Sequence, residues 1–153
     1  MEVIETIRQA LNSHGLKATP QRIAVYRAIL QLKNHPDTDQ IIAKVIAENP
    51  TISSGTVYKT LDTFAEHDII SRIKTDSGRM RFDHITKNHH HLYDKSTDRI
   101  EDYQDENLNQ LISEYFEKKN IEGFELADIK LQIIGKFTEV QKFRSSEVQE
   151  FRR

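Results

Sequence analysis

The segment TISSGTVYKTLDTFAEHDIISRIKTDSGRMRFD, residues 51–83, contains the pattern that determines the predicted fold. Ser53 is a suitable N-cap for a helix that continues to about His67, with apolar side chains on one face and polar side chains on the other. Two strand-like stretches, 69–74 and 79–83, follow it and flank an Asp-Ser-Gly turn. A helix followed by a short hairpin is typical of a winged helix-turn-helix, although small helical domains without a DNA-binding role also show this pattern.

Apolar residues recur every three or four positions in three segments upstream, which predicts three more helices. A glycine can end the first of them, a Thr-Pro pair is typical of an N-cap with proline at the first helical position, and a threonine can cap the third. The residues that begin or end these helices are Val3, Gly15, Thr19, Pro20, Leu32, Thr38 and Asn49. The predicted winged helix-turn-helix domain therefore covers residues 1–83.

The pattern changes after Asp83, so we place a second domain at residues 84–153 and a hinge at about residues 83–88. The expected elements are strands at 89–94 and 98–103, a helix capped by Asp105, a strand at 127–133 and a closing helix from Phe137 to Phe151. A domain this small buries little core by itself, and we expect it to form a homodimer through its sheet. The predicted fold class is α+β, a winged helix-turn-helix followed by a small α/β dimerisation domain.

The composition limits the classes of function. Of the 153 residues, 37% are hydrophobic and 30% are charged, and no apolar run approaches the roughly 20 residues that cross a membrane. The start lacks a secretory signal, so we expect a cytoplasmic protein without membrane association. The chain has no cysteine, which excludes disulfides, thiolate zinc sites and cysteine nucleophiles. A net charge of -2 argues against sequence-independent nucleic-acid binding but permits DNA contact through one cationic face.

Four of the seven histidines are close together in the sequence, at positions 84, 89, 90 and 91. Side chains alternate along a strand, so His89 and His91 point to one side and His90 to the other. A His-x-His pair on a strand can present two imidazoles to one metal ion. Histidines that occur singly more often make ordinary hydrogen bonds, and we interpret His14, His67, His84 and His90 in that way.

Carboxylates are available near the same strand. If the hairpin loop spans residues 94–97, His89 lies opposite Asp102, whereas a slip of one residue would bring Glu101 there. Asp83, at the end of the wing, can fold back to the same point. Imidazole and carboxylate without sulfur suit Fe(II), Mn(II) or Zn(II). The alternative is a solvated polar strand that binds no metal.

Five motifs occur in an order and at separations that resemble the ferric uptake regulator family, and the resemblance covers nearly the whole chain. They are GLKATPQR at 15–22, HP followed by QI at 35–41, SGTVYKTL at 54–61, RFD with HHH at 81–91, and Asp102. The resemblance implies a DNA-binding repressor with an inverted-repeat operator. It also implies DNA contacts from Lys17, Tyr58 and Lys59.

The resemblance implies one regulatory metal site per protomer, for Fe2+ or Mn2+, with Zn2+ also able to bind in vitro. Its ligands would be His35, Asp83, His89, His91 and Asp102. Periodicity does not point to His35, and only the resemblance does. In the family, Asp at position 102 is typical of peroxide sensors and Glu of iron sensors. In such sensors metal-catalysed oxidation of a ligand histidine releases DNA, and the matching residues here are His35 and His89.

This sequence departs from the family pattern at two other metal sites. The places of the four structural-zinc cysteines hold Asp94, Thr97, Phe137 and Val140. We therefore expect no structural zinc, and we expect the two apolar residues to pack against the sheet instead. We also expect the family's additional site to be lost, because its positions hold Asn88, His90, Asn109 and Ile129, and isoleucine cannot bind a metal.

Three alternatives to a peroxide-sensing repressor remain from the sequence. The first is a repressor of the same family that senses iron level. The second is a non-haem metalloenzyme, since two histidines and a carboxylate can hold iron with three positions open. Five protein ligands leave one position, and no nucleophile motif is present, so we predict that the protein is not an enzyme. The third is a DNA-binding module that no longer responds to metal.

Overall fold

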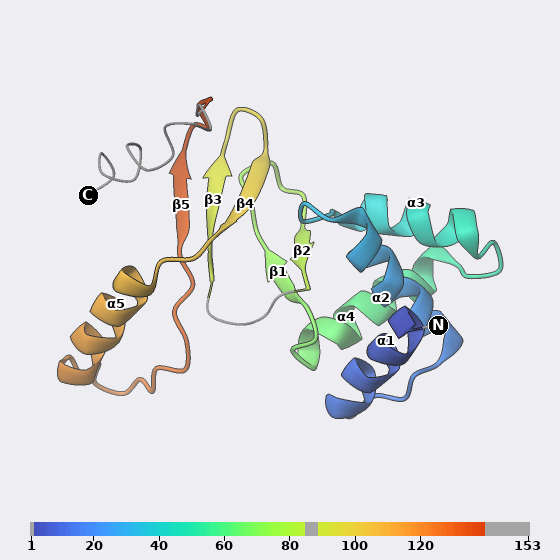
Figure 1. Cartoon of the computed structure of the whole chain (residues 1–153), viewed down its shortest axis with the longest axis horizontal. Helices are drawn as coiled ribbons and strands as arrows, with labels where there is room; N and C mark the ends of the chain where they lie inside the picture. Colours follow the sequence, from blue (N-terminus) through green and yellow to red (C-terminus); the bar gives the residue numbers. More distant parts are fainter. Residues whose placement is uncertain (1, 85–88, 140–153) are drawn as a thin grey trace.

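The computed structural model describes residues 2–84 and 89–139, and its elements separate into a helical part and a sheet part (Figure 1). We call residues 2–83 the helical unit and residues 89–139 the sheet unit. The helical unit contains α1 (Glu2–Ser13), α2 (Pro20–Leu32), α3 (Thr38–Glu48), α4 (Ser54–Glu66), β1 (Ser71–Ile73) and β2 (Arg81–Asp83). The sheet unit contains β3 (His90–Asp94), β4 (Arg99–Tyr103), α5 (Glu106–Lys118) and β5 (Gln132–Gly135). The predicted α+β fold with an amino-terminal winged helix-turn-helix is confirmed.

The helices begin at residues whose side chains satisfy free backbone N–H groups. Thr19 accepts from Arg22 N before α2, and Ser53 accepts from Thr56 N before α4, as the sequence predicts. The predicted cap of α3 was wrong by one residue. Asp37, rather than Thr38, accepts from the N–H of Gln40, and the Gln40 side chain returns a bond to complete a capping box.

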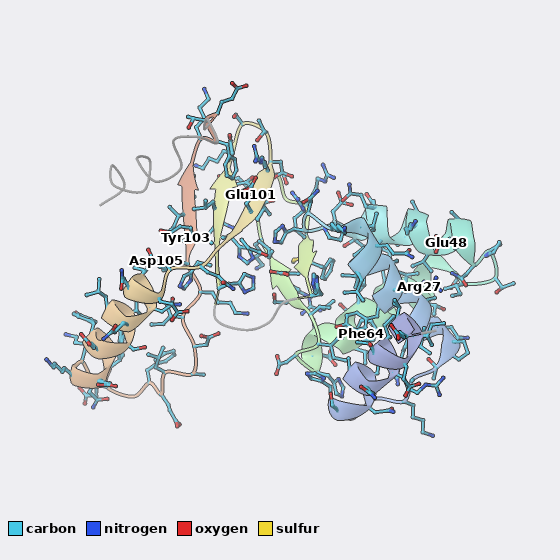
Figure 2. The ribbon with its side chains drawn as sticks, in the orientation of Figure 1. Arg27, Glu48, Phe64, Glu101, Tyr103 and Asp105 are labelled. Carbon is cyan, nitrogen blue, oxygen red and sulfur yellow. The ribbon has the colours of Figure 1, made fainter. Side chains whose placement is uncertain are left out.

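The core of the helical unit is formed by apolar side chains from all four helices and from β2. Its buried members are Ile7, Leu11, Leu16, Val25, Ala28, Ile29, Ile41, Val45, Val57, Leu61, Phe64, Ile69, Ile70 and Phe82. Phe64 lies on the inner side of α4 (Figure 2), where its ring packs edge-on against Tyr26 with centroids 5.9 Å apart. This core fixes α4 and the β1–β2 wing relative to the other helices.

The hairpin of β3 and β4 shows that the predicted register was wrong by two residues. His91, not His89, lies opposite Asp102, and Asp94 lies opposite Arg99. The turn has the expected length but begins one residue later, because Asp94 still belongs to the strand and its carboxylate accepts from Ser96. A shift of two residues preserves the face of the sheet, so Asp102 remains on the side of His91.

The remainder of the sheet unit differs more from the prediction. The strand expected at 127–133 is β5, Gln132–Gly135, and it pairs parallel to β3. The helix capped by Asp105 is present, but α5 has no buried residue. The closing helix expected from Phe137 falls mostly on residues 140–153, which lie outside the described residues. Among the described residues, no helix combines the length and the apolar character that crossing a bilayer would require.

Candidate metal centre

Five side chains predicted as ligands come from separate parts of the chain and meet at one place. His35 lies in the loop between α2 and α3, and Asp83 is the last residue of β2. His89 directly precedes β3, His91 is its second residue, and Asp102 is on β4. The cluster therefore lies where the helical unit contacts the hairpin of the sheet unit.

Two carboxylate oxygens face three imidazole nitrogens in this cluster. The Nε2 atoms of His89, His91 and His35 lie 2.5, 3.0 and 3.7 Å from Asp83 Oδ2. The same atoms lie 3.4, 3.5 and 2.7 Å from Asp102 Oδ1. One ligand atom from each of these residues except His89 lies within 4.8 Å of the others.

The donor set fits one divalent ion. Ligands at about 2.1 Å from a single metal lie roughly 3–4 Å from one another, and four of the six distances above fall within that range. The cluster holds one buried carboxylate, that of Asp83, and one exposed carboxylate, that of Asp102, and a divalent cation would bind between them. His35 Nε2 is the nitrogen that faces the cluster, because it lies 2.7 Å from Asp102 Oδ1. The other ring nitrogen, Nδ1, is buried without a hydrogen-bond partner among the described residues. Nitrogen and oxygen donors without sulfur suit Fe(II), Mn(II) or Zn(II).

The cluster is closed on most sides and open at one carboxylate. Asp83 and His89 are each 3% exposed, whereas the Asp102 side chain is 37% exposed. An open cavity of about 570 Å³ lies beside Asp102 and His35, between the α2–α3 loop and β4. Solvent-borne molecules therefore reach this centre from the Asp102 side.

His35 reaches the cluster through an unusual backbone path. Lys33, Asn34 and His35 all have positive φ, at 52°, 54° and 59°, which L-residues adopt infrequently. Phe82 N–H donates to Pro36 O at 2.9 Å, which attaches this loop to β2. No local periodicity reveals such a loop, which explains why the residues alone did not predict His35.

Comparison with known proteins identifies the family. The sequence model of the ferric uptake regulator family matches residues 13–134, most of the chain. This chain belongs to that family. The Staphylococcus aureus peroxide-responsive repressor PerR is 33% identical over 110 residues, 72% of each chain. The ferric uptake regulation protein of Rhizobium leguminosarum bv. viciae is 27% identical over 135 residues, 88% of this chain and 93% of that protein.

A solved structure extends the comparison. The Campylobacter jejuni peroxide stress regulator matches with a TM-score of 0.67 at 28% identity, over 86% of this chain and 96% of that chain. The resemblance predicted from the five motifs is thus confirmed. As a member of the ferric uptake regulator family, the chain is a metal-responsive, DNA-binding transcription regulator.

His90 lies on the opposite face of β3 and is not part of the cluster. Leu131 N–H donates to His90 Nδ1 at 3.1 Å, and His90 Nε2 lies 2.7 Å from Asn109 Oδ1. An accepting Nδ1 requires the proton on Nε2, which then donates to the amide oxygen. His90 thus connects β3 to α5 and to the segment before β5, as the hydrogen-bonding interpretation expects. Asn88, another position of the family's additional site, lies outside the described residues.

In this member of the ferric uptake regulator family, the residues at the positions of the structural-zinc cysteines make other contacts. Phe137 N–H donates to Asp94 Oδ2 at 3.2 Å, and the Arg99 guanidinium lies 4.2 Å from the Phe137 ring centroid. The pKa of Asp94 falls to about 2, first because Ser96 Oγ donates to the carboxylate, and against the effect of burial. Backbone N–H groups, including that of Phe137, contribute to the same lowering. Thr97 lies in the exposed turn, and Val140 lies outside the described residues.

The three DNA-contact candidates lie in the helical unit and away from the cluster. Tyr58, on α4, is 51% exposed. Lys59 follows it on the same helix, and Lys17 lies in the segment before α2, and both are exposed. Arg22 donates to Lys17 O at 3.1 Å, which holds that segment against the start of α2. All three side chains are thus accessible to a bound duplex.

Proposed function

We propose that this protein is a repressor that binds DNA when Fe2+ or Mn2+ occupies the cluster of His35, Asp83, His89, His91 and Asp102. The observation that carries the proposal is the contact between His35 Nε2 and Asp102 Oδ1 at 2.7 Å. It joins the loop after α2 to the hairpin, so ligands from both units face one point. Zn2+ would also bind there in vitro, because the donors are nitrogen and oxygen.

The ligands link metal occupancy to the orientation of the DNA-binding helix. His35 belongs to the helical unit, whereas His89, His91 and Asp102 belong to the sheet unit. The hinge would lie at residues 83–88, between domains of residues 1–83 and 84–153. Closure around an ion would hold α4 at a fixed angle to the partner protomer's α4. A coupling of about 1–3 kcal/mol corresponds to a change in DNA affinity of about 5- to 150-fold.

The DNA partner would be an inverted repeat read by a homodimer. Two recognition helices related by a twofold axis require a palindromic site. On each protomer Tyr58 would contact base edges, while Lys17 and Lys59 would contact the backbone. The exposed apolar face of α5 supports dimerisation, since Leu111 and Tyr115 are 65% and 58% exposed in one chain.

We propose peroxide as the signal. Asp102, rather than glutamate, occupies the carboxylate position on β4, and the relatives named above include two peroxide regulators. A ferrous ion held by the cluster would supply the redox chemistry that reduces peroxide. His35 and His89 would hold their imidazoles beside the ion. Peroxide would transfer one oxygen atom to one of these rings, leaving water as the other product, and that ring would cease to be a ligand. Five protein ligands leave a single open position, which does not suit a metalloenzyme that must hold a cosubstrate and oxygen.

A mobility-shift assay with Mn2+ tests the metal dependence. His91→Ala should weaken DNA binding in Mn2+ to the level measured with chelator, a loss of about 5- to 150-fold. His90→Gln is the matched control, since His90 is the next residue on β3 but faces away from the cluster. Equal binding by wild type with and without chelator would sink the proposal and leave an unregulated DNA-binding module.

The same complexes distinguish peroxide from iron level as the signal. Fe2+-loaded wild type should lose DNA after peroxide, and mass spectrometry should find one added oxygen on His35 or His89. Mn2+-loaded protein is the control and should keep its DNA, because Mn2+ does not support this oxidation. Intact histidines in protein that still requires Fe2+ for DNA binding would point to iron-level sensing instead.

A further inference from the structure

Arg81 on β2 contacts both units at once. On one side its guanidinium donates to the His35 carbonyl through Nε and to the Asn34 carbonyl through Nη2, the latter at 3.0 Å. On the other side Nη1 donates to Asp98 O at 2.7 Å and to Asp98 Oδ2 at 3.1 Å. The side chain is only 11% exposed, so these bonds are largely shielded from water.

The acceptors on the loop side determine where His35 lies. Asn34 and His35 both have positive φ, which residues other than glycine adopt only where surrounding contacts hold the backbone in place. Hydrogen bonds to their carbonyl groups are contacts of this kind. Arg81 supplies donors to both carbonyls. The carbonyls of His35 and of the residue before it are therefore both held by one guanidinium.

The acceptor on the hairpin side is itself held firmly. Asp98 closes the turn between β3 and β4, and its Oδ1 accepts from the hydroxyl of Tyr93 at 2.8 Å. Tyr93 is 1% exposed and anchors that carboxylate to a small core that Tyr93 and Ile100 share with Ile73 of β1. Ser77, at the tip of the wing, lies 3.4 Å from Asp98 Oδ2. Arg81 thus connects the loop carbonyls to a turn carboxylate that other side chains also hold.

We propose that Arg81 is a positioning residue that holds His35 over the β3–β4 hairpin, and so sets the distance between the ligands of the two units. The role in metal affinity rests on the proposed function above, whereas the role in holding the loop does not. A planar guanidinium can serve both sides through fixed, divergent N–H groups, and a lysine ammonium on a flexible stem cannot.

Arg79 provides a matched comparison. It lies two residues earlier in the sequence and pairs with Asp37 in the same loop. Among the described residues, however, Arg79 forms no hydrogen bond or ion pair with the hairpin of β3 and β4. Arg79→Lys therefore disturbs the attachment of the wing to the loop while leaving the connection through Arg81 intact.

Amide hydrogen exchange in metal-free full-length protein tests the connection. Phe82 N–H, bonded to Pro36 O, reports on the loop, and Asp98 N–H, bonded to Asp94 O, reports on the turn. Arg81→Lys should accelerate exchange at both amides, while Arg79→Lys should leave the Asp98 amide unchanged. Acceleration at one amide only, or at neither, would overturn the proposal.

Mn2+ titration of the same variants tests the effect on the cluster. Arg81→Lys should weaken Mn2+ binding about 10- to 100-fold, the usual effect of removing a residue that orients a ligand. In a His35→Ala background the same substitution should have no further effect, because the ligand that Arg81 positions is gone. A merely structural role would weaken binding equally in both backgrounds. Failure of wild type to bind Mn2+ would contradict the proposed function, and amide exchange would then decide the role of Arg81 alone.

Discussion

The buried side chains of α1–α4 are mainly apolar, whereas those of β3 are mainly polar. The helical unit encloses a continuous apolar core to which all four helices contribute. In the sheet unit the buried apolar residues are Tyr93 and Ile100, and the buried polar residues are His89, His90, His91 and Asp94. On β4, Glu101 and Tyr103, both labelled in Figure 2, are half-buried.

This difference indicates how each unit obtains its stability. Burial of apolar area, at about 25 cal/mol per Å², can fold the helical unit without any ligand. The sheet unit has little such area in one chain, and it relies on hydrogen bonds of buried polar groups. An ion at the cluster and a second protomer against α5 would add what that unit lacks. A sensor whose regulated part is held by weaker interactions responds to ligand more readily than one with a complete core.

The largest loss of unfolding free energy should come from a cavity in the helical unit. Phe64 is fully buried and packs edge-on against Tyr26. Phe64→Ala should lower the free energy of unfolding by about 3–5 kcal/mol, measured by urea denaturation in chelator. Tyr58→Ala on the same helix is the control, and its loss should stay within about 0.5 kcal/mol because Tyr58 is exposed. Similar losses in the two variants would contradict the apolar core of the helical unit, on which the contrast between the units rests.

A smaller loss of stability, which depends on pH, is expected from a substitution of Asp94 in the sheet unit. Its pKa falls from 3.8 to about 2 in the folded chain, first because the Ser96 hydroxyl donates to the carboxylate. A depressed pKa means that the stabilisation is fully present above pH 3.8 and is lost as the pH falls toward 2.

Asp94→Asn should therefore lower the melting temperature of the metal-free protein by a few degrees at neutral pH. The difference from wild type should shrink as the pH falls below about 4. Circular dichroism melts in chelator measure this, with the exposed Asp39→Asn as the control. If the difference in melting temperature between wild type and Asp94→Asn stays constant across the acid range, the Asp94 carboxylate does not connect the turn to Phe137.

Local chemistry was sufficient to predict most of the elements. Thr19, Ser53 and Asp105 were identified as caps because each acts on an N–H three residues later in the chain. Asp37 displaced Thr38 as the cap of α3 for a reason that is partly non-local. Its carboxylate also pairs with Arg79 on the far side of the wing, which adjacent residues cannot reveal.

The errors lie where distant segments meet. The parallel pairing of β5 with β3 determines where that strand begins, and the alternation of residues 127–133 does not encode it. Face alternation placed His89, His91 and Asp102 on one side even with the wrong register, because a two-residue shift keeps the face. His35 depends on a left-handed loop held by Arg81, so only the family resemblance indicated it.

The smallest effect on a single chain is expected on α5. Leu111 is 65% exposed and contributes to no core among the described residues, so Leu111→Gln should change the unfolding free energy of dilute monomer by less than about 0.5 kcal/mol. If a second protomer covers this face, the same substitution should raise the dimer dissociation constant about tenfold, because an apolar side chain would no longer be buried. Analytical ultracentrifugation measures that constant, and Glu114→Gln on the same helix provides a polar control. An unchanged dissociation constant for Leu111→Gln would mean that α5 does not form the dimer contact. The small apolar core of the sheet unit would then have to be stabilised by contacts at another surface.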